Sequence, residues 1–482
     1  MERGSMRILH YLPGLPPVRG GGLIKYALDL MEAESEKNDI FLLIPGVIDK
    51  KRENRKQIRI RRAGKWKNIP VYRIKNPLPI PMGNGILDIE EFTLPCEENV
   101  YYEFLQDLRP DVIHVHTFMG LHKEFLEMAH KLTIPIVNTT HDYFGICPTA
   151  NLVCRNKICD APGKLCGECS RGAFSEKRLL LEQSVPYRLY RKSDFLIKLL
   201  QMDALKKRLS SMRSKMPEMT TEEEATQDDI QHDTITPMDN HNSPSEEEYA
   251  RLLGYYREMF GKITYFHFNS FVTKQIYEQY LGELPGEVLF ICNKSVTDKR
   301  TVHESTGKIK IGFLGGDVPF KGLRRLQKVV GKLYDKGNRQ IELQIYGSLE
   351  QKTYPFCKYY DAYKQEERDA VFGKMDILAV PSSWMETFGM VVLEALSYGV
   401  PVVVTDMVGA KGLIENREQP MGIILPDEDS EWEECLVDLC GNSSKIKEMS
   451  RNICGADMDL NYSVHVQAIM RVYERNIALF KR

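Results

Sequence analysis

The chain has 482 residues, of which 43% are hydrophobic and 27% are charged, so it can build sizeable apolar cores. At roughly 150 residues per domain, this length predicts about three domains, or two large ones with insertions. The net charge of -2 argues against a globally basic nucleic-acid binder, and no apolar run approaches the ~20 residues of a membrane-spanning helix.

The first half of the chain alternates short apolar runs with helical patterns. Residues 6–12 are a predicted strand, and a glycine-rich loop leads from it into a predicted helix. Further predicted strands begin at Asp39, Asp111 and Pro135, with a helix over 125–132. Repetition of strand and helix is typical of a parallel, doubly wound sheet.

The same rhythm restarts after about residue 300. Predicted strands begin at Lys308, Ile341, Met375 and Val400, and a helix over 326–333 follows the first of them. Because a single core rarely grows past ~250–300 residues, two α/β domains are expected, over 6–295 and 296–460. An amphipathic helix over 461–482 is expected to return to the first domain. Ligands are expected in a central cleft between the two domains.

A segment of different composition interrupts the first domain. Residues 216–248 contain eleven acids and no Lys or Arg, with Pro, Ser, Thr and Asn between them. Such a composition buries too little surface to offset its ordering entropy, so a mobile tip is expected. Its flanks look helical, and we therefore predict a helical and acidic insertion over about 185–262, built as an arm.

The most specific motif lies in the second domain. Glu386 and Glu394 are eight positions apart and bracket a predicted helix that begins near Phe388. The unpaired N–H groups at the start of this helix would favour a phosphate. A capped core helix with two exposed acids would explain the spacing alone equally well.

The sequence PSSWMETFGMVVLEALSYGVPVVVTD from Pro381 resembles the donor-site motif of family 4 retaining glycosyltransferases with the GT-B fold. The resemblance extends to GFLGGDVPFKG from Gly312, to IYG ending at Gly347, to the glycine loop and to THD from Thr140. It implies two Rossmann-like domains, with the acceptor on the first and a nucleoside-diphosphate sugar on the second. It also implies donor-binding roles for Gly20, Gly21, Gly22, Gly347, Phe388, Gly389, Met390 and Glu394.

The same resemblance implies catalytic roles for Lys321, Glu386 and His141. Glu394 would hold the ribose, and Glu386 and His141 would contact the transferred sugar. The Lys321 ammonium would stabilise the charge that develops on the departing diphosphate. Where the family usually has an arginine five residues before this lysine, the chain has Gly316. Taken without the resemblance, a lone histidine such as His141 is more often structural, and we expect His114 and His116 to pack.

Five cysteines lie within the loop over 147–169. Cys166 and Cys169 form a Cys-x-x-Cys pair, a spacing suited to metal chelation. Cys147, Cys159, Cys166 and Cys169 also resemble a cysteine set in one branch of the family. A structural zinc and a reduced loop without metal are equally open interpretations. The eleven cysteines of the chain are otherwise scattered, which favours a reducing compartment, and we expect a cytoplasmic protein without a signal peptide.

Residues 50–67 hold ten basic residues and a single acid. A solvated hairpin edge is the favoured interpretation, and attraction to an anionic inner membrane face or to a lipid-linked acceptor is the functional one. The family resemblance implies a retaining glycosyltransferase that needs no metal cofactor for catalysis and acts on a glycan or lipid-linked hydroxyl in glycoconjugate synthesis. The alternatives are a non-catalytic GT-B partner subunit and a sugar-nucleotide epimerase. No nucleic-acid partner is expected.

Overall fold

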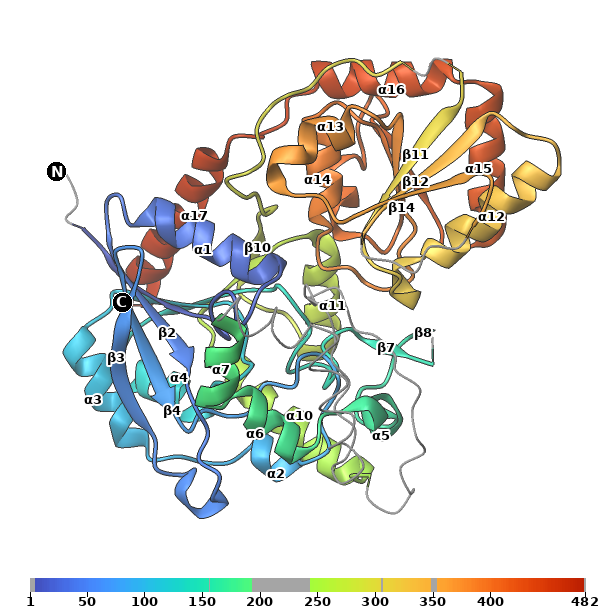
Figure 1. Cartoon of the computed structure of the whole chain (residues 1–482). Helices are drawn as coiled ribbons and strands as arrows, with labels where there is room; N and C mark the ends of the chain where they lie inside the picture. The colour runs from blue at the N-terminus through green and yellow to red at the C-terminus, as the bar shows by residue number, and fades with distance from the viewer. Residues whose placement is uncertain (1–4, 156, 193–242, 305–306, 348–352, 481–482) are drawn as a thin grey trace.

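The computed structural model describes residues 5–155, 157–192, 243–304, 307–347 and 353–480. These residues form two α/β domains that lie one above the other in Figure 1. Most of the acidic tip expected over 216–248 lies outside the described residues. In the described part of the chain, no helix is long and apolar enough to cross a membrane.

The N-terminal domain is built on a sheet of eight strands in the order β10-β9-β6-β5-β1-β2-β4-β3. Neighbouring strands run parallel, except that β3 pairs antiparallel with β4 at the edge. The strands are β1 Arg7–Tyr11, β2 Asp39–Pro45, β3 Arg59–Trp66, β4 Ile69–Lys75, β5 Val112–Val115, β6 Ile136–Thr139, β9 Tyr265–Phe268 and β10 Gly286–Val288. Strands β7 Val153–Cys154 and β8 Lys157–Ile158 form a separate small hairpin.

Helices surround the N-terminal sheet, and the apolar stripes of the longer ones pack against its strands. The helices are α1 Gly22–Glu34, α2 Ile89–Phe92, α3 Glu98–Leu108, α4 Lys123–Lys131, α5 Cys166–Cys169, α6 Glu176–Glu182, α7 Val185–Lys192, α10 Glu246–Phe260 and α11 Phe271–Leu281. Contrary to the expected projecting arm, α10 is part of this domain. Its residues Tyr249, Leu252 and Met259 are buried in the domain core, and they hold the helix against the body of the domain.

The C-terminal domain has a parallel sheet of six strands in the order β13-β12-β11-β14-β15-β16. This is the 3-2-1-4-5-6 order of a Rossmann fold. The strands are β11 Ile309–Leu314, β12 Ile341–Tyr346, β13 Cys357–Tyr360, β14 Ile377–Val380, β15 Val402–Thr405 and β16 Gly422–Leu425. The helices are α12 Leu323–Asp335, α13 Arg368–Phe372, α14 Met390–Ser397, α15 Asp429–Gly441 and α16 Ser444–Gly455. Helix α14 begins at Met390, two residues later than the sequence predicts, because Gly389 at its N-cap has a φ of 94°.

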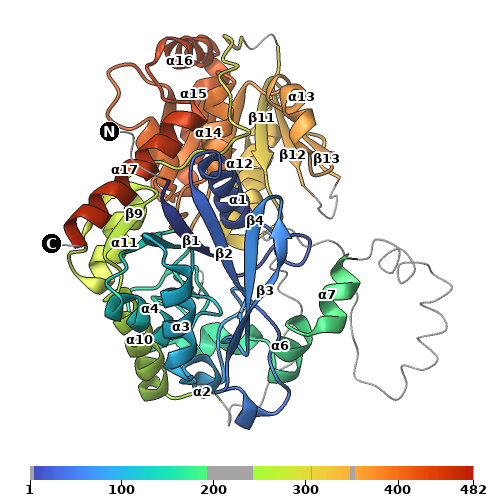
Figure 2. The same ribbon diagram turned by 90° about the vertical axis from the view of Figure 1, so that its left-hand side faces the viewer.

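The last helix, α17 Tyr462–Phe480, leaves the C-terminal domain and lies beside α1 and β9 of the N-terminal domain (Figure 2). The Tyr473 hydroxyl is 2.6 Å from Nδ1 of His114 in β5. Asn476 donates from Nδ2 to Oγ1 of Thr264 at 2.8 Å. Helix α17 therefore fastens the two domains together, and one apolar cluster contains residues of both.

Candidate functional site

In each sheet, the strand order reverses at one point, where open α/β sheets bind ligands. In the N-terminal sheet this point lies between β1 and β5, and in the C-terminal sheet between β11 and β14. The glycine loop follows β1, Lys321 follows β11, and Glu386 follows β14. The topology alone therefore places three of the predicted site segments at the two switch points.

Lys321 and Glu386 form an ion pair at the C-terminal switch point. The Lys321 ammonium lies 2.8 Å from Oε1 of Glu386, and Ser382 donates from its hydroxyl to Oε2 at 2.8 Å. The Glu386 side chain is only 10% exposed and that of Lys321 is 21% exposed. The Trp384 ring lies 5.8 Å from the Lys321 nitrogen. The pair is thus held in one geometry from several sides.

The glycine after Lys321 explains why this lysine lies where it does. Gly322 has a φ of 78°, and a Cβ there would come within 1.9 Å of the carbonyl oxygen of Pro381. The turn before α12 therefore packs directly on the loop that follows β14. Because no side chain fits between these two backbones, Lys321 is brought within reach of Glu386.

Glu394 lies in a second polar cluster, which the sequence does not predict as a whole. Its Oε1 is 2.7 Å from Nη2 of Arg368, and the Tyr363 hydroxyl donates to its Oε2 at 3.2 Å. Burial raises the pKa of the Glu394 carboxyl, and the Arg368 and Lys25 cations oppose this shift. Lys25 of α1 donates to the Ser295 hydroxyl at 3.1 Å, and Arg368 donates to the Ser295 carbonyl at 3.3 Å, so Lys25 belongs to the same cluster.

The glycine loop leaves the start of α1 accessible. A Cβ at Gly20 or Gly22 would meet no other atom within 4 Å, so there is open space in front of both residues. Gly21 is the N-cap, and no side chain caps the helix. The N–H groups at the start of α1 are therefore available to an anion. Helix α14 likewise has no side-chain cap at Gly389.

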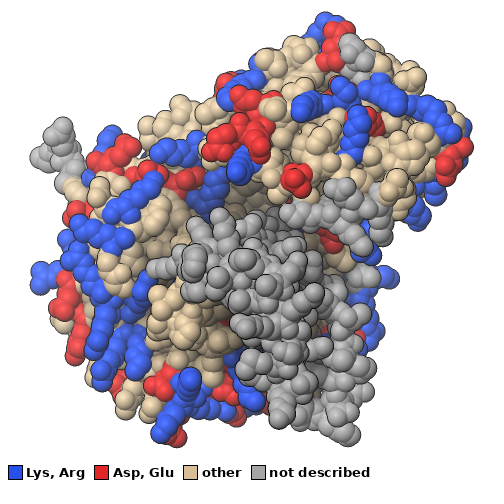
Figure 3. Space-filling model, in the orientation of Figure 1, with Lys and Arg blue, Asp and Glu red and all other residues tan. Residues whose placement is uncertain are grey.

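His141 connects the two domains at the site. Its carbonyl oxygen accepts a hydrogen bond from the Thr387 hydroxyl at 3.1 Å, and Thr387 follows Glu386 directly. The Thr387 carbonyl in turn accepts from the Ser270 hydroxyl at 2.6 Å. Burial lowers the pKa of His141 to about 3, so the ring is neutral near pH 7. The surface is indented where the two domains meet (Figure 3).

The remaining predicted donor residues surround this point. Phe388 is buried with its ring 6.1 Å from that of Phe290, and its carbonyl accepts from the N–H of Ala410. Met390 opens α14. Gly347 follows β12, one strand further from β14 than β11, so it lies at the border of the group. Gly316, in the position of the expected arginine, is buried.

The cysteine loop does not form a compact ligand set in the structure. The thiols of Cys147, Cys159 and Cys166 are near enough to influence one another's charge, and burial raises the pKa of Cys166 to about 12. Among the described residues, however, no three cysteine sulfur atoms lie within 4.8 Å of one another. A zinc ion would need these side chains to come closer together than they are here.

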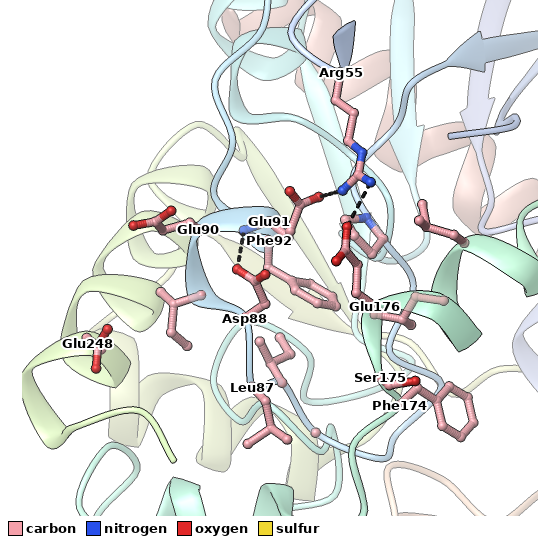
Figure 4. A pocket seen from close by; sticks show the side chains of 16 residues that line it. Arg55, Leu87, Asp88, Glu90, Glu91, Phe92, Phe174, Ser175, Glu176 and Glu248 are labelled. Atoms are coloured by element: carbon pink, nitrogen blue, oxygen red, sulfur yellow. Dashed lines mark hydrogen bonds and ion pairs between the residues drawn. The ribbon is translucent and has the colours of Figure 1, made fainter. Parts of the chain in front are cut away.

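A cavity of about 330 Å³ lies elsewhere, between α2, α6 and α10 (Figure 4). Arg55 extends over it and pairs with Glu91 at 2.5 Å and with Glu176 at 2.9 Å. Figure 1 places these helices at the end of the N-terminal domain that points away from the C-terminal domain. The cavity is therefore separate from the group around Lys321, and its buried carboxylate is already matched by an arginine.

Two Rossmann-like domains with their switch points at a shared boundary define the GT-B fold, as the sequence predicts. Residues 295–452, which include most of the C-terminal domain, match the family model of glycosyl transferases group 1. HepE (Alr3699) of Anabaena, solved in complex with UDP, has a TM-score of 0.55 at 13% identity over 98% of this chain and 100% of its own. The catalytic domain of starch synthase IV from Arabidopsis thaliana, bound to ADP and acarbose, has a TM-score of 0.54 at 12% identity, with the same coverage.

Among curated relatives, a phosphatidyl-myo-inositol mannosyltransferase of Propionibacterium freudenreichii is 33% identical over 98 residues. This match covers 20% of the chain and 26% of the relative. The chain thus spans about a quarter of the length of this relative. The similarity supports the class of the matched segment, and the activity of the whole protein is a matter for proposal.

Sequence reasoning missed several residues of the site. Arg368, Tyr363 and Lys25 meet Glu394 from three different elements, and Ser382 and Thr387 hold the Glu386 loop. Only Lys25, one turn after the glycine loop, has a position that could have been noticed. Arg368 lies in a polar stretch without a motif, and only the folded chain brings it to Glu394.

Proposed function

We propose that the chain is a retaining glycosyltransferase that moves a sugar from a nucleoside-diphosphate sugar to a hydroxyl of a glycan or lipid-linked acceptor. The observation that carries the proposal is the partly buried Lys321–Glu386 pair at the C-terminal switch point, beside His141 of the other domain. In this reaction the bond between the anomeric carbon and the diphosphate breaks. The acceptor oxygen bonds to that carbon from the same face, and its proton leaves with the diphosphate.

The proposed roles follow from position and charge. Lys321 stabilises the departing diphosphate, together with the N–H groups at the starts of α1 and α14. Glu386 and His141 bind the sugar, and Glu394 holds the ribose with Arg368 and Tyr363 around it. Structural neighbours with this fold were solved with UDP and with ADP, which supports a nucleoside-diphosphate sugar as donor. In this proposal the positive groups of the chain replace a catalytic divalent metal.

Two acidic pairs in the C-terminal domain bear on the metal question. Asp427 and Asp429 both form ion pairs with Arg325, and Asp429 also pairs with Lys328 at 2.7 Å. Their charges are thus already matched by cations of α12. The second pair, Asp457 and Asp459, lies in the segment between α16 and α17. The ion pairs of Asp427 and Asp429 support donor activation by Lys321 rather than by a metal bound to these two carboxylates.

The basic edge of the N-terminal domain suits an anionic partner. Strand β3 is the edge strand, and its residues Arg59, Arg61, Arg62 and Lys65 are exposed. Figure 3 shows Lys and Arg side chains gathered on this side of the domain. Each such cation near an anionic bilayer contributes about 1 kcal/mol. We therefore propose that the protein is cytoplasmic and makes peripheral contact with the inner membrane face.

The function is tested by incubating the purified protein with a panel of nucleoside-diphosphate sugars, with and without hydroxyl acceptors. We expect acceptor-dependent release of a nucleoside diphosphate, unchanged by EDTA, and a product with the anomeric configuration of the donor. An inverted product would refute retention, and activity lost in EDTA and restored by a divalent metal would refute metal independence. A changed sugar on an intact nucleotide would indicate an epimerase. Neither turnover nor donor binding across the whole panel would indicate a partner subunit, which Gly316 favours.

The cysteine loop gives a separate prediction. We propose that the loop, if it binds metal at all, binds about one zinc ion per chain, with Cys166 and Cys169 of helix α5 among the ligands. Elemental analysis of the purified protein should find this zinc, and Cys166→Ser should lose it. Cys435→Ser, in the C-terminal domain, is the matched control and should keep it. Zinc content that Cys166→Ser leaves unchanged would refute the assignment.

A further inference from the structure

A chain of hydrogen-bonded side chains runs through the N-terminal domain to His141. Nε2 of His10 lies 2.8 Å from Oε2 of Glu34, and Nδ1 of His10 lies 3.1 Å from Nε2 of His116. Nδ1 of His116 then lies 3.2 Å from Nε2 of His141. Glu34, His10 and His116 are each at most 2% exposed, so water does not compete for these bonds.

The chain draws its members from three elements of the fold. Glu34 ends α1, His10 lies in β1, and His116 directly follows β5. Strands β1 and β5 are neighbours, and His10 is paired in register with His114. This series of hydrogen bonds therefore starts at the C-terminal end of α1, away from the glycine loop, and ends beside the Glu386 loop.

A second chain runs next to the first but does not reach His141. It begins at the carbonyl oxygen of Leu289, which can only accept, 2.8 Å from Nε2 of His267. Burial lowers the pKa of His267 to about 4, so the ring is neutral and its Nδ1 must accept. The Thr139 hydroxyl donates to it at 2.8 Å. Thr139 accepts from Nε2 of His114 at 2.7 Å.

The second chain reaches the Tyr473 hydroxyl, which therefore donates to Nδ1 of His114 and lies close to the Glu34 carboxylate of the first chain. Its direction is fixed by the Leu289 carbonyl. The second hydrogen-bonded chain is a useful comparison for the first, because it also consists of buried histidine rings. It also shows how one acceptor at the end determines every proton along a chain of neutral histidines.

The direction of the first chain follows from the same logic. A buried carboxylate beside a histidine commonly holds one tautomer of the ring, because the carboxylate accepts from one ring nitrogen. The proposal takes His10 to carry one ring proton, on the nitrogen that faces Glu34, so that Nε2 donates to Glu34 and Nδ1 accepts from Nε2 of His116. Nδ1 of His116 accepts from Nε2 of His141. Burial holds the pKa of His116 well below its usual value, which keeps that ring neutral.

These bonds also account for a cluster that has the spacing of a metal site. One ring nitrogen each of His10, His114 and His116 lies within 4.8 Å of the others. With the two chains assigned, each unprotonated nitrogen of these rings accepts a hydrogen bond, from His116, Tyr473 and His141 respectively. No lone pair of the three rings is left for a cation, so the cluster serves proton placement.

We propose that Glu34, His10 and His116 are positioning residues that place the ring proton of His141 on Nε2 and leave its Nδ1 as a hydrogen-bond acceptor. Nδ1 of His141 has no hydrogen-bond partner in the described part of the chain, and the residue is partly exposed. Resting on the proposed function, this nitrogen would accept from a hydroxyl of the donor sugar. A sugar whose group at that position can only accept a hydrogen bond would not be bound by Nδ1 of His141.

The test reads the tautomer directly in the ligand-free protein. Histidine labelled with ¹⁵N in the ring distinguishes protonated from unprotonated nitrogens by long-range ¹H–¹⁵N correlation, and a His141→Asn variant identifies the His141 signals. At neutral pH we expect a proton on Nε2 and a bare Nδ1. A proton on Nδ1, or a doubly protonated ring, would overturn the proposal without any variant.

Two variants that keep an aromatic ring then show whether the His141 proton depends on this hydrogen-bonded chain or only on the packing around it. His116→Phe removes the acceptor of the His141 proton, so the His141 signals should shift toward the average of two tautomers. His114→Phe is equally buried but belongs to the second chain, so it should leave them unchanged. Equal shifts in both variants, or none in His116→Phe, would overturn the proposal. Since no sugar nucleotide is used, an inactive protein with the expected tautomer would contradict only the proposed function.

Discussion

Replacing Lys321 with alanine is expected to lower the rate of sugar transfer by roughly 10²–10³, which corresponds to about 3–4 kcal/mol of transition-state stabilisation. The ammonium lies 2.8 Å from Glu386 and is held by the packing of Gly322 on Pro381, so it needs no reorganisation as charge develops. Its removal takes away a fixed positive charge that acts more on the departing diphosphate than on the bound donor. The turnover number at saturating donor should therefore fall more than donor affinity.

Lys328→Ala is the matched control for this variant. Lys328 lies on α12, the helix that follows Lys321, and its exposed side chain pairs with Asp429. It should leave the rate unchanged, because exposed ion pairs contribute little and the residue is not in the site. Full activity in Lys321→Ala, or an equal loss in both variants, would contradict the catalytic role of Lys321.

The sequence predicts the fold well because its information is local. Apolar runs such as that of β14, whose four residues are all buried, can be recognised without knowing their neighbours. Glu386 and Glu394 are recognisable for the same reason, since one loop and one helix carry both. The expectation for α10 was wrong in part, because acidic residues at its start hide a buried stripe that includes Tyr249 and Leu252.

The rest of the site depends on contacts between distant parts of the chain. The bond between His10 and His116 joins residues 106 positions apart, and the pair of His114 and Tyr473 joins residues 359 apart. A histidine in a strand looks the same whether it packs or belongs to such a chain. The role of Arg368 is invisible for the same reason, because its partner Glu394 lies across a strand and two loops.

Breaking the Arg368–Glu394 pair is the change with the largest expected effect on stability. Both side chains are at most 9% exposed, and Arg368→Met would leave the Glu394 carboxylate buried without its cation. We expect the free energy of unfolding to fall by about 3–5 kcal/mol, as for other buried pairs that lose one partner. Urea unfolding followed by tryptophan fluorescence measures this, since Trp432 is buried in the same domain.

A second substitution, at Glu394, shows whether the lost stability of Arg368→Met comes from the unpaired carboxylate or from lost packing. Adding Glu394→Gln to Arg368→Met removes the charge, so the double variant should be more stable than Arg368→Met alone. Burial already raises the pKa of Glu394, and losing Arg368 should raise it further. A carboxyl whose folded pKa is raised destabilises the fold when ionised, so the loss of stability in Arg368→Met should shrink as pH falls through that pKa.

Lys299→Met is the control, because it breaks the exposed pair with Asp369, which lies beside Arg368 on α13, and it should change nothing measurable. If the losses of Arg368→Met and Glu394→Gln simply add at every pH, the two side chains are not energetically coupled, and Arg368 acts through packing alone.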